Sequence, residues 1–182
     1  MTAYIALLRG INVGGNKQVA MADLRALVAR LGFADARTLL QSGNLVFRSD
    51  RRSPAQLERV LEAETVRRLG LEAAYFVRTA GEWHAVVAGN PFRAEAARDP
   101  ARLAVMVLKD VPAARNVAAL RAAITGREAL RAAGRHLYVV YPDGMGRSRL
   151  THTLIEKMLG TRATGRNWNT VRKLAAVCAD ME

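Results

Sequence analysis

The order in which strand-like and helix-like segments alternate constrains the fold of this chain more than any single motif. Residues 4–9 read as a buried strand, and residues 21–31 follow with apolar side chains at the spacing of one helical face. Two strand-like segments within 36–48 precede a helix that starts after Ser53 and a strand at 73–78. This β-α-β-β-α-β order predicts a ferredoxin-like sheet.

The same order recurs later in the chain, although the two parts share no matching sequence. The predicted elements are a strand at 103–108, a helix at 113–123, a hairpin of 127–132 and 135–141, a helix at 148–159, a weak strand at 161–164 and a last helix at about 168–179. We therefore predict an α+β chain with two ferredoxin-like halves and an extra C-terminal helix. The predicted domains are residues 1–88 and 102–182, joined by a linker at 89–101.

Capping signals mark several boundaries. Ser53 followed three residues later by Gln56 is a capping box, and Thr79 followed by Glu82 repeats that spacing before a short helix. Gly70 stands where the helix after Ser53 should stop.

The net charge of +12 invites a nucleic-acid function, because basic domains attract phosphate backbones. However, 24 of the 28 basic residues are arginine and they are spread along the chain, which indicates codon bias in a GC-rich genome instead. No run of 18 apolar residues and no secretory leader are present, so we expect a cytoplasmic protein without a membrane span. The single cysteine, Cys178, lies on the apolar face of the last predicted helix and is expected in the core.

A glycine-rich segment with two cations follows the first strand. Glycines let backbone N–H groups approach an anion, and nearby cations add charge. The candidate ligand-binding residues are Arg9, Asn12, Gly14, Gly15 and Lys17. The spacing matches neither a dinucleotide-binding loop nor a Walker A loop, so a long connecting loop that needs positive φ is the alternative.

The turn between the second and third predicted strands supplies a second candidate group, Gln41, Ser42 and Asn44. Glycine and asparagine suit a tight hairpin, which by itself explains this sequence. In a β-α-β-β-α-β sheet, however, this hairpin lies at the same end as the loop after the first strand. The polar groups of both segments are therefore expected to converge.

Two further stretches lie in the second half. Arg147 and Ser148 open the helix predicted at 148–159, with Ser148 as its N-cap, and could bind an anion or form an ordinary turn. The last stretch contributes Arg166, Asn167, Trp168 and Asn169. Here Trp168 could stack on a nucleoside, but helix capping by an asparagine and core packing of the tryptophan are the favoured alternatives.

Catalytic groups are not evident. The three histidines are scattered without the spacing of metal ligands, and no nucleophile elbow or general base is identified. We predict no metal site, and the sequence leaves enzymatic activity and cofactors open.

Four stretches together resemble one bacterial family, the domain of unknown function 1697. They are ALLRGINVGGNK (6–17), QSGNLVF (41–47), YPDGMGRSRL (141–150) and ATGRNWNTVRKL (163–174). The resemblance spans nearly the whole chain and implies a compact α+β protein with ferredoxin-like parts, whose signature segments are these polar loops. Arg149 stands where the family pattern leads us to expect lysine, which favours anion binding over a catalytic amine.

The sequence therefore predicts an anion site for a phosphorylated small molecule or nucleotide. Residues of the first half would form one wall, and the arginines and asparagines of the second half would close it. The alternatives are a nucleic-acid-binding module, an enzyme acting on a phosphorylated small molecule, and an adaptor that binds another protein without a ligand pocket. The oligomeric state is left open.

Overall fold

The structure, a computed structural model, describes residues 1–9, 18–50 and 52–181. By their internal contacts the residues form two units, Met1–Ala85 with Lys173–Glu182 and Val86–Arg172. The boundaries between the units fall inside two helices, α3 (Ala80–Ala88) and α7 (Trp168–Ala179).

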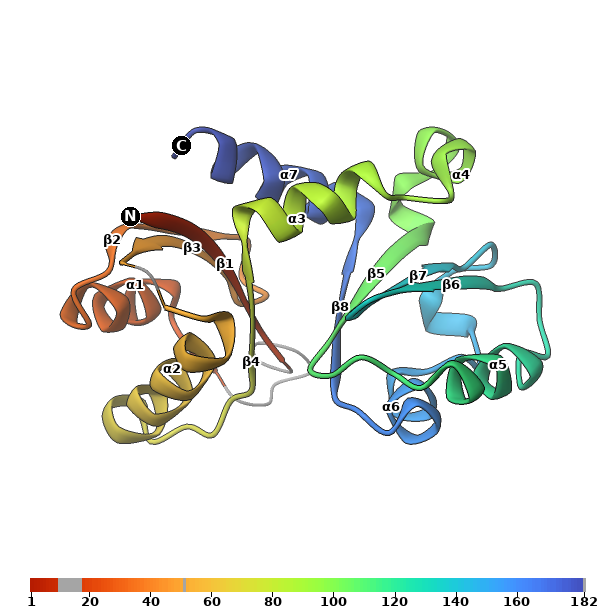
Figure 1. Ribbon diagram of the computed structural model, residues 1–182, viewed down its shortest axis with the longest axis horizontal. Coiled ribbons are helices and arrows are strands. Elements are labelled where there is room, and N and C mark those ends of the chain that lie inside the picture. The colour runs from red at the N-terminus through yellow and green to blue at the C-terminus, as the bar shows by residue number, and fades with distance from the viewer. Residues whose placement is uncertain (10–17, 51, 182) are drawn as a thin grey trace. The chain divides into compact units, whose positions relative to one another are not determined.

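The first unit contains a four-stranded antiparallel sheet with strand order β2-β3-β1-β4. Its elements are β1 (Thr2–Leu8), α1 (Met21–Arg30), β2 (Ala34–Leu39), β3 (Asn44–Ser49), α2 (Pro54–Leu69) and β4 (Tyr75–Thr79). Helices α1 and α2 pack on the same face of this sheet (Figure 1). The predicted α+β class and the β-α-β-β-α-β order are confirmed.

The core of the first unit lies between this sheet and its two helices. Leu24 and Val28 of α1 and Leu57 of α2 pack with alternate strand residues such as Leu8. The opposite face of β1 is buried as well, as the 0% exposure of Ile5 shows. Burial on both faces explains why this strand is a continuous apolar run instead of an alternating one.

The predicted capping signals are confirmed. The Gln56 N–H donates to Ser53 Oγ (3.2 Å), and the Ser53 N–H donates to Gln56 Oε1 (2.9 Å). Gly70 ends α2 in the left-handed conformation with φ 63°. Thr79 and Glu82 exchange the same pair of bonds at the start of α3, where the Glu82 N–H donates to Thr79 Oγ1 over 3.1 Å.

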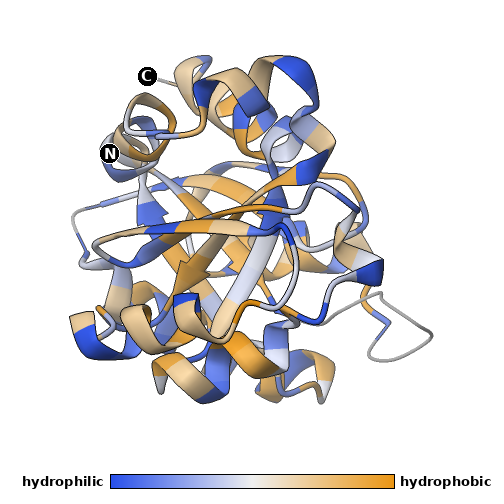
Figure 2. Ribbon diagram, turned by 90° about the vertical axis from the view of Figure 1, so that its right-hand side faces the viewer, coloured by the Kyte–Doolittle hydropathy of each residue, from blue (hydrophilic) through white to orange (hydrophobic). Residues whose placement is uncertain are grey.

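The second unit contains a second four-stranded antiparallel sheet, with strand order β6-β7-β5-β8. Its elements are α4 (Arg93–Arg98), the short helix η1 (Pro100–Arg102), β5 (Leu103–Leu108), α5 (Ala114–Ala122), β6 (Ala129–Ala133), β7 (His136–Val140), the short helix η2 (Met145–Arg147), α6 (His152–Leu159) and β8 (Ala163–Asn167). Hydrophobic stretches run along several strands, whereas the helices mix hydrophilic and hydrophobic residues (Figure 2). The predicted linker, 89–101, contains α4 and part of η1; the predicted domain limits stay a prediction.

The two sheets repeat one register. Ile5 of β1 pairs with Arg78 of β4, and Val105 of β5 pairs with Arg166 of β8 at the same place in the second sheet. Both arginines are at least nine-tenths buried, and each stands two residues before the helix that follows its strand. The halves are therefore similar in backbone and in this one residue type, despite the lack of matching sequence.

Carboxylates from neighbouring helices cover the β4 edge of the first sheet. Three backbone N–H groups of β4 donate outward to glutamate side chains. Their partners are Glu62 for Tyr75 at 3.0 Å, Glu58 for Val77 at 2.9 Å and Glu82 for Thr79 at 2.8 Å. In the second unit, Glu156 of α6 accepts from the Ala163 N–H of β8 over 3.0 Å. Both halves thus satisfy edge donors that would otherwise attract another strand.

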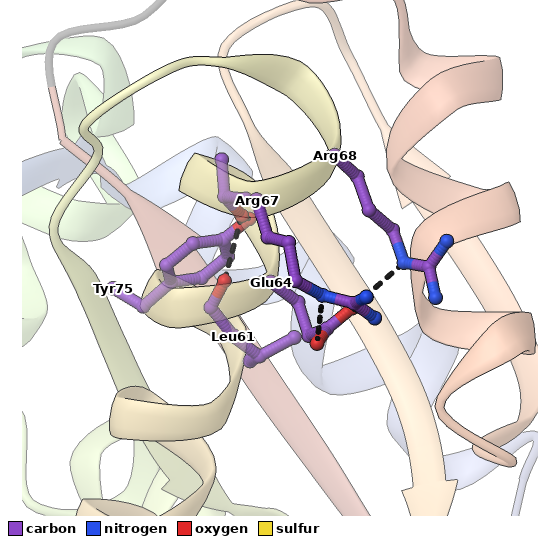
Figure 3. Close-up of polar contacts among 6 residues, drawn as sticks. Leu61, Glu64, Arg67, Arg68 and Tyr75 are labelled. Carbon is purple, nitrogen blue, oxygen red and sulfur yellow. Dashed lines mark hydrogen bonds and ion pairs between the residues drawn. The ribbon is translucent and has the colours of Figure 1, made fainter.

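Helix α2 is also tied to β4 through a buried hydroxyl pair (Figure 3). Thr65 Oγ1 donates to the Leu61 carbonyl over 2.7 Å and lies 2.8 Å from the Tyr75 hydroxyl. Burial raises the pKa of Tyr75 to about 12. On the outer side of the same helix, Glu64 bonds to Arg67 and Arg68 at the surface.

Replacing Glu58 should destabilise the protein through the edge strand. Glu58→Ala removes the acceptor of the Val77 N–H and leaves that donor buried, so the free energy of unfolding should fall by about 1–3 kcal/mol. Urea unfolding measures this loss. Glu58→Gln retains an acceptor oxygen and should lose less, and Arg59→Ala, an exposed change on the same helix, should have little effect. Equal losses for all three variants would contradict the assignment.

Tyr75 should make stability fall in alkaline solution. Its pKa is about 12 in the folded protein and about 10 in an unfolded chain, so the folded state holds the phenolic proton more tightly. This contribution is fully present below pH 10 and is lost as the pH rises toward 12. Between those limits, wild type should lose about 1–3 kcal/mol more than Tyr75→Phe in urea unfolding. Parallel curves for the two proteins would refute the coupling.

Candidate functional site

The end of β1 lies beside the turn that joins β2 to β3. The Leu8 N–H donates to the Gly43 carbonyl over 2.9 Å, and the Arg9 N–H donates to the Ala74 carbonyl over 3.0 Å. The predicted adjacency of these two segments is therefore confirmed in the backbone. We call Arg9 together with residues 41–44 the Arg9 corner.

The turn of the Arg9 corner is held in an unusual conformation. Leu40 and Gly43 both have left-handed backbone, with φ 61° and 76°. Glycine adopts this region freely, whereas a residue with a Cβ is disfavoured there by about 1–2 kcal/mol. The buried Asn44 stabilises the turn, because its Nδ2 donates to the Leu39 carbonyl (2.8 Å) and to Ser42 Oγ (2.9 Å).

Three side chains of the Arg9 corner reach the surface. Gln41 is exposed, whereas Ser42 and Arg9 are half-buried. The other residues predicted for this wall lie outside the described part of the chain. They are Asn12, Gly14, Gly15 and Lys17.

An equivalent corner exists in the second unit and was not singled out from the sequence. The Leu108 N–H donates to the Arg135 carbonyl (2.9 Å), and the Lys109 N–H donates to the Arg162 carbonyl (3.0 Å). These bonds repeat those of Leu8 and Arg9. The available signal was that Lys109 follows an apolar strand directly, as Arg9 does.

Ser148 serves the backbone of the second unit. Its hydroxyl donates to Glu128 Oε1 (2.6 Å) and accepts from the Leu150 N–H (3.0 Å). The prediction that Ser148 caps the following helix is wrong: α6 begins at His152, and Thr151 accepts the capping bond from Leu154. The sequence offered both hydroxyls, and local spacing did not distinguish them.

Arg147 and Arg166 are in opposite environments. Arg147 is exposed at the end of η2. Arg166 is 9% exposed, and its Nη1 donates to Thr164 Oγ1 (2.9 Å) and to the Gly165 carbonyl (2.8 Å). Burial lowers the pKa of Arg166 to about 10, so the guanidinium still carries its charge at neutral pH.

The three residues after Arg166 also differ in their environments: one caps a helix, one is buried in the core and one is exposed. Asn167 Oδ1 accepts from the Thr170 N–H over 3.0 Å, which confirms the asparagine cap of the last helix. Trp168 is 5% exposed and belongs to the core, whereas Asn169 is exposed. Cys178 is buried, as predicted. Ligand binding by this group stays a prediction.

The sequence analysis also missed Arg78, which is completely buried on β4. Its Nη1 donates to the Val77 carbonyl (2.8 Å) and lies 4.0 Å from Glu58 Oε1. An arginine inside an apolar strand was the signal, since arginine is almost never fully buried unless it is paired.

Within residues 1–9, 18–50 and 52–181, no three histidine, cysteine, aspartate or glutamate side chains gather in a way that could hold a metal ion. In the same residues, no helix has both the length and the apolar character needed to cross a membrane.

The fold and the corners define a class: an α+β protein built from two similar halves, each with a cation at the end of its central strand. The chain belongs to the family described as "Protein of unknown function (DUF1697)", whose family model matches residues 1–138. The family recognised in the sequence is thereby confirmed; the match includes the stretches 6–17 and 41–47 and ends before 141–150 and 163–174.

A solved structure supports the same fold. It is described as that of conserved bacterial protein SP0830 from Streptococcus pneumoniae, and it is 24% identical with a TM-score of 0.76. The similarity covers 97% of this chain and 98% of that chain. Among curated proteins, none matches this sequence.

Relieving the left-handed backbone at Leu40 should stabilise the protein. Leu40 is 51% exposed, so its side chain contributes little packing. Asparagine tolerates this conformation better, so Leu40→Asn should raise the free energy of unfolding by about 0.5–1 kcal/mol in urea titrations. The control is Leu40→Ala, because alanine has a Cβ but does not tolerate left-handed backbone as asparagine does. Its free energy of unfolding should not rise. A gain in both variants would mean that the leucine side chain itself is unfavourable.

Proposed function

We propose that the chain binds a phosphorylated small molecule or nucleotide at the Arg9 corner. The observation that carries the proposal is the 2.9 Å hydrogen bond from the Leu8 N–H to the Gly43 carbonyl. This bond keeps the half-buried Arg9 next to a turn whose Gln41 and Ser42 reach the surface. A guanidinium forms charge-assisted and often bidentate hydrogen bonds with phosphate oxygens.

Each residue has a separate role in the proposal. Arg9 supplies the charge, and the hydrogen bond from its N–H to the Ala74 carbonyl fixes its backbone before binding. Ser42 contributes a hydroxyl to the surface of the corner, and its Oγ is held in place by the bond from Asn44. Gln41 adds amide donors from the exposed side of the turn. Asn44 supports the turn and does not touch the ligand.

The residues that the sequence analysis predicted for the site in the second half of the chain are not needed for it. Its members belong to the other unit, and Ser148, Arg166 and Asn167 already have partners that explain their presence. The proposal therefore concerns one corner of the first unit, and it is narrower than the composite site predicted from the sequence.

Nucleic acid, a protein partner without a pocket and catalysis on a phosphorylated substrate are the competing functions. Binding to a nucleic-acid backbone depends on many phosphate contacts and weakens steeply with salt, whereas a compact site with a few contacts weakens less. Salt dependence therefore separates nucleic-acid binding from the proposed function, whereas a protein partner without a pocket predicts no shift with any phosphorylated small molecule.

The Arg9 corner should give a ligand-dependent thermal shift. Nucleoside monophosphates, sugar phosphates, inorganic phosphate and a short RNA are tested on the purified chain by differential scanning fluorimetry. A ligand present at about 100 times its Kd should stabilise the protein by about 2.7 kcal/mol. Arg9→Ala should abolish the shift, because it removes the charge while retaining the backbone bond of residue 9.

The control is Arg59→Ala, which removes one exposed cation from the same unit and should retain the shift. A small-molecule shift that survives high salt and is lost only in Arg9→Ala supports the proposal. No shift with any phosphorylated small molecule, or a shift with RNA alone that disappears in salt, overturns it.

A further inference from the structure

The outer strands of the two sheets in the described part of the chain differ in how their edges are protected. Strands β4 and β8 have N–H groups that donate to glutamates of adjacent helices. Strand β2 is irregular, with a register shift between Ala34 and Arg37 and a left-handed residue at Asp35. Carboxylate caps and bulges are two ways in which proteins prevent an edge from pairing with another chain.

Among the residues that the structure describes, strand β6 has neither kind of protection. It pairs with β7 in an unbroken register from Ala129 to Ala133 and is the outer strand of the second sheet. Within the described chain, no hydrogen bond joins the β6 backbone to anything except β7. Three of its five residues are exposed alanines, whose small side chains let another backbone approach. The outer edge of β6 therefore offers a regular row of donors and acceptors.

Two hollows flank this edge. The larger, of about 590 Å³, is lined by Arg121 and Ile124 beside α5, by Phe92, and by Leu130 of β6. The second, of about 480 Å³, shares Ala129 with the first hollow. It lies against α4 and the end of β7 and includes Val140 and Pro142. A strand added beside β6 would direct alternate side chains to opposite faces, toward one hollow and then the other.

The charge around the edge is mainly positive. Five arginines line the two hollows, namely Arg98, Arg102, Arg121, Arg127 and Arg131, against three carboxylates. One of those carboxylates, Glu128, accepts the Ser148 hydroxyl, and another, Asp99, pairs with Arg102. Arg127 pairs with Asp143, so Arg98, Arg121 and Arg131 are the cations that give this edge its positive charge. The cations, together with Ile124 and Leu130, match a segment in which acidic and aliphatic side chains alternate.

We propose that β6 is a docking edge for an extended acidic peptide, which adds to the second sheet as a fifth strand. Backbone hydrogen bonds to β6 supply affinity, and the arginine-lined hollows select acidic side chains. This interaction involves the second unit alone and is independent of ligand binding at the Arg9 corner.

A second copy of this chain is the less suitable occupant. Antiparallel pairing of two β6 strands would bring two copies of Arg131 onto the same small sheet edge, and like charges across neighbouring strands are destabilising. The net charge of +12 on each copy adds to this repulsion. An acidic partner removes both costs.

The test uses fluorescence anisotropy with the full chain and a fluorescein-labelled octapeptide of alternating glutamate and valine. Two matched peptides accompany it: one with lysine in place of glutamate, and one with the same glutamate–valine sequence but methylated backbone nitrogens at every second residue. We expect the unmodified acidic peptide to bind at least about tenfold more tightly than either matched peptide, a difference of about 1.4 kcal/mol. Hydrogen exchange should show new protection in β6 when this peptide is present.

Two charge reversals locate the site. Arg131→Glu should weaken peptide binding about tenfold, whereas Arg59→Glu makes the same charge change in the first unit and should leave binding unchanged. Equal binding of the methylated and unmodified peptides would overturn the proposal, because strand addition needs the backbone donors. The absence of binding at about 1 mM peptide would also overturn it. So would protection of β6 without peptide that arises from self-association of the chain and changes in Arg131→Glu.

Discussion

The central strand of each sheet, β1 or β5, is the constraint on which the rest of its half depends. Each is hydrogen-bonded along both edges and lies in a core on both faces. A shift of one residue would move every side chain to the opposite face, so the register is strongly specified. Because the register is fixed, the end of β1 brings Arg9 beside the β2–β3 turn, and the end of β5 brings Lys109 beside Arg135. The two cationic corners therefore result from strand pairing and not from the loop sequences themselves.

Local patterns were sufficient to predict most of the fold. The run LAVMVL at 103–108 is β5, and the boxes at Ser53 and Thr79 cap the helices that they were predicted to cap. These signals act within a few residues, so they can be seen in a single sequence. The start of α6 could not be predicted in this way. Ser148 and Thr151 are both good caps, and the choice depends on the bond from Ser148 to the distant Glu128.

The candidate site was predictable only in part. The adjacency of the end of β1 and the β2–β3 turn follows from the order of the elements, and the Leu8–Gly43 bond confirms it in the backbone. The convergence of their polar side chains stays a prediction. The role of Asn44 in holding that turn follows from ordinary hairpin chemistry. By contrast, the burial of Arg78 and the glutamate caps along β4 depend on which helix packs against which strand edge. No local spacing in the sequence reports that packing.

The first unit is completed by residues that are far apart in the chain. It joins residues 1–85 to the segment that starts at Lys173, with the whole second unit between them. Domains usually fold in the order in which they leave the ribosome. Here the N-terminal residues cannot complete their own unit as they are made, because one of its segments begins only at Lys173. The packing of the first unit therefore depends on a stretch of chain that is synthesised after the whole of the second unit.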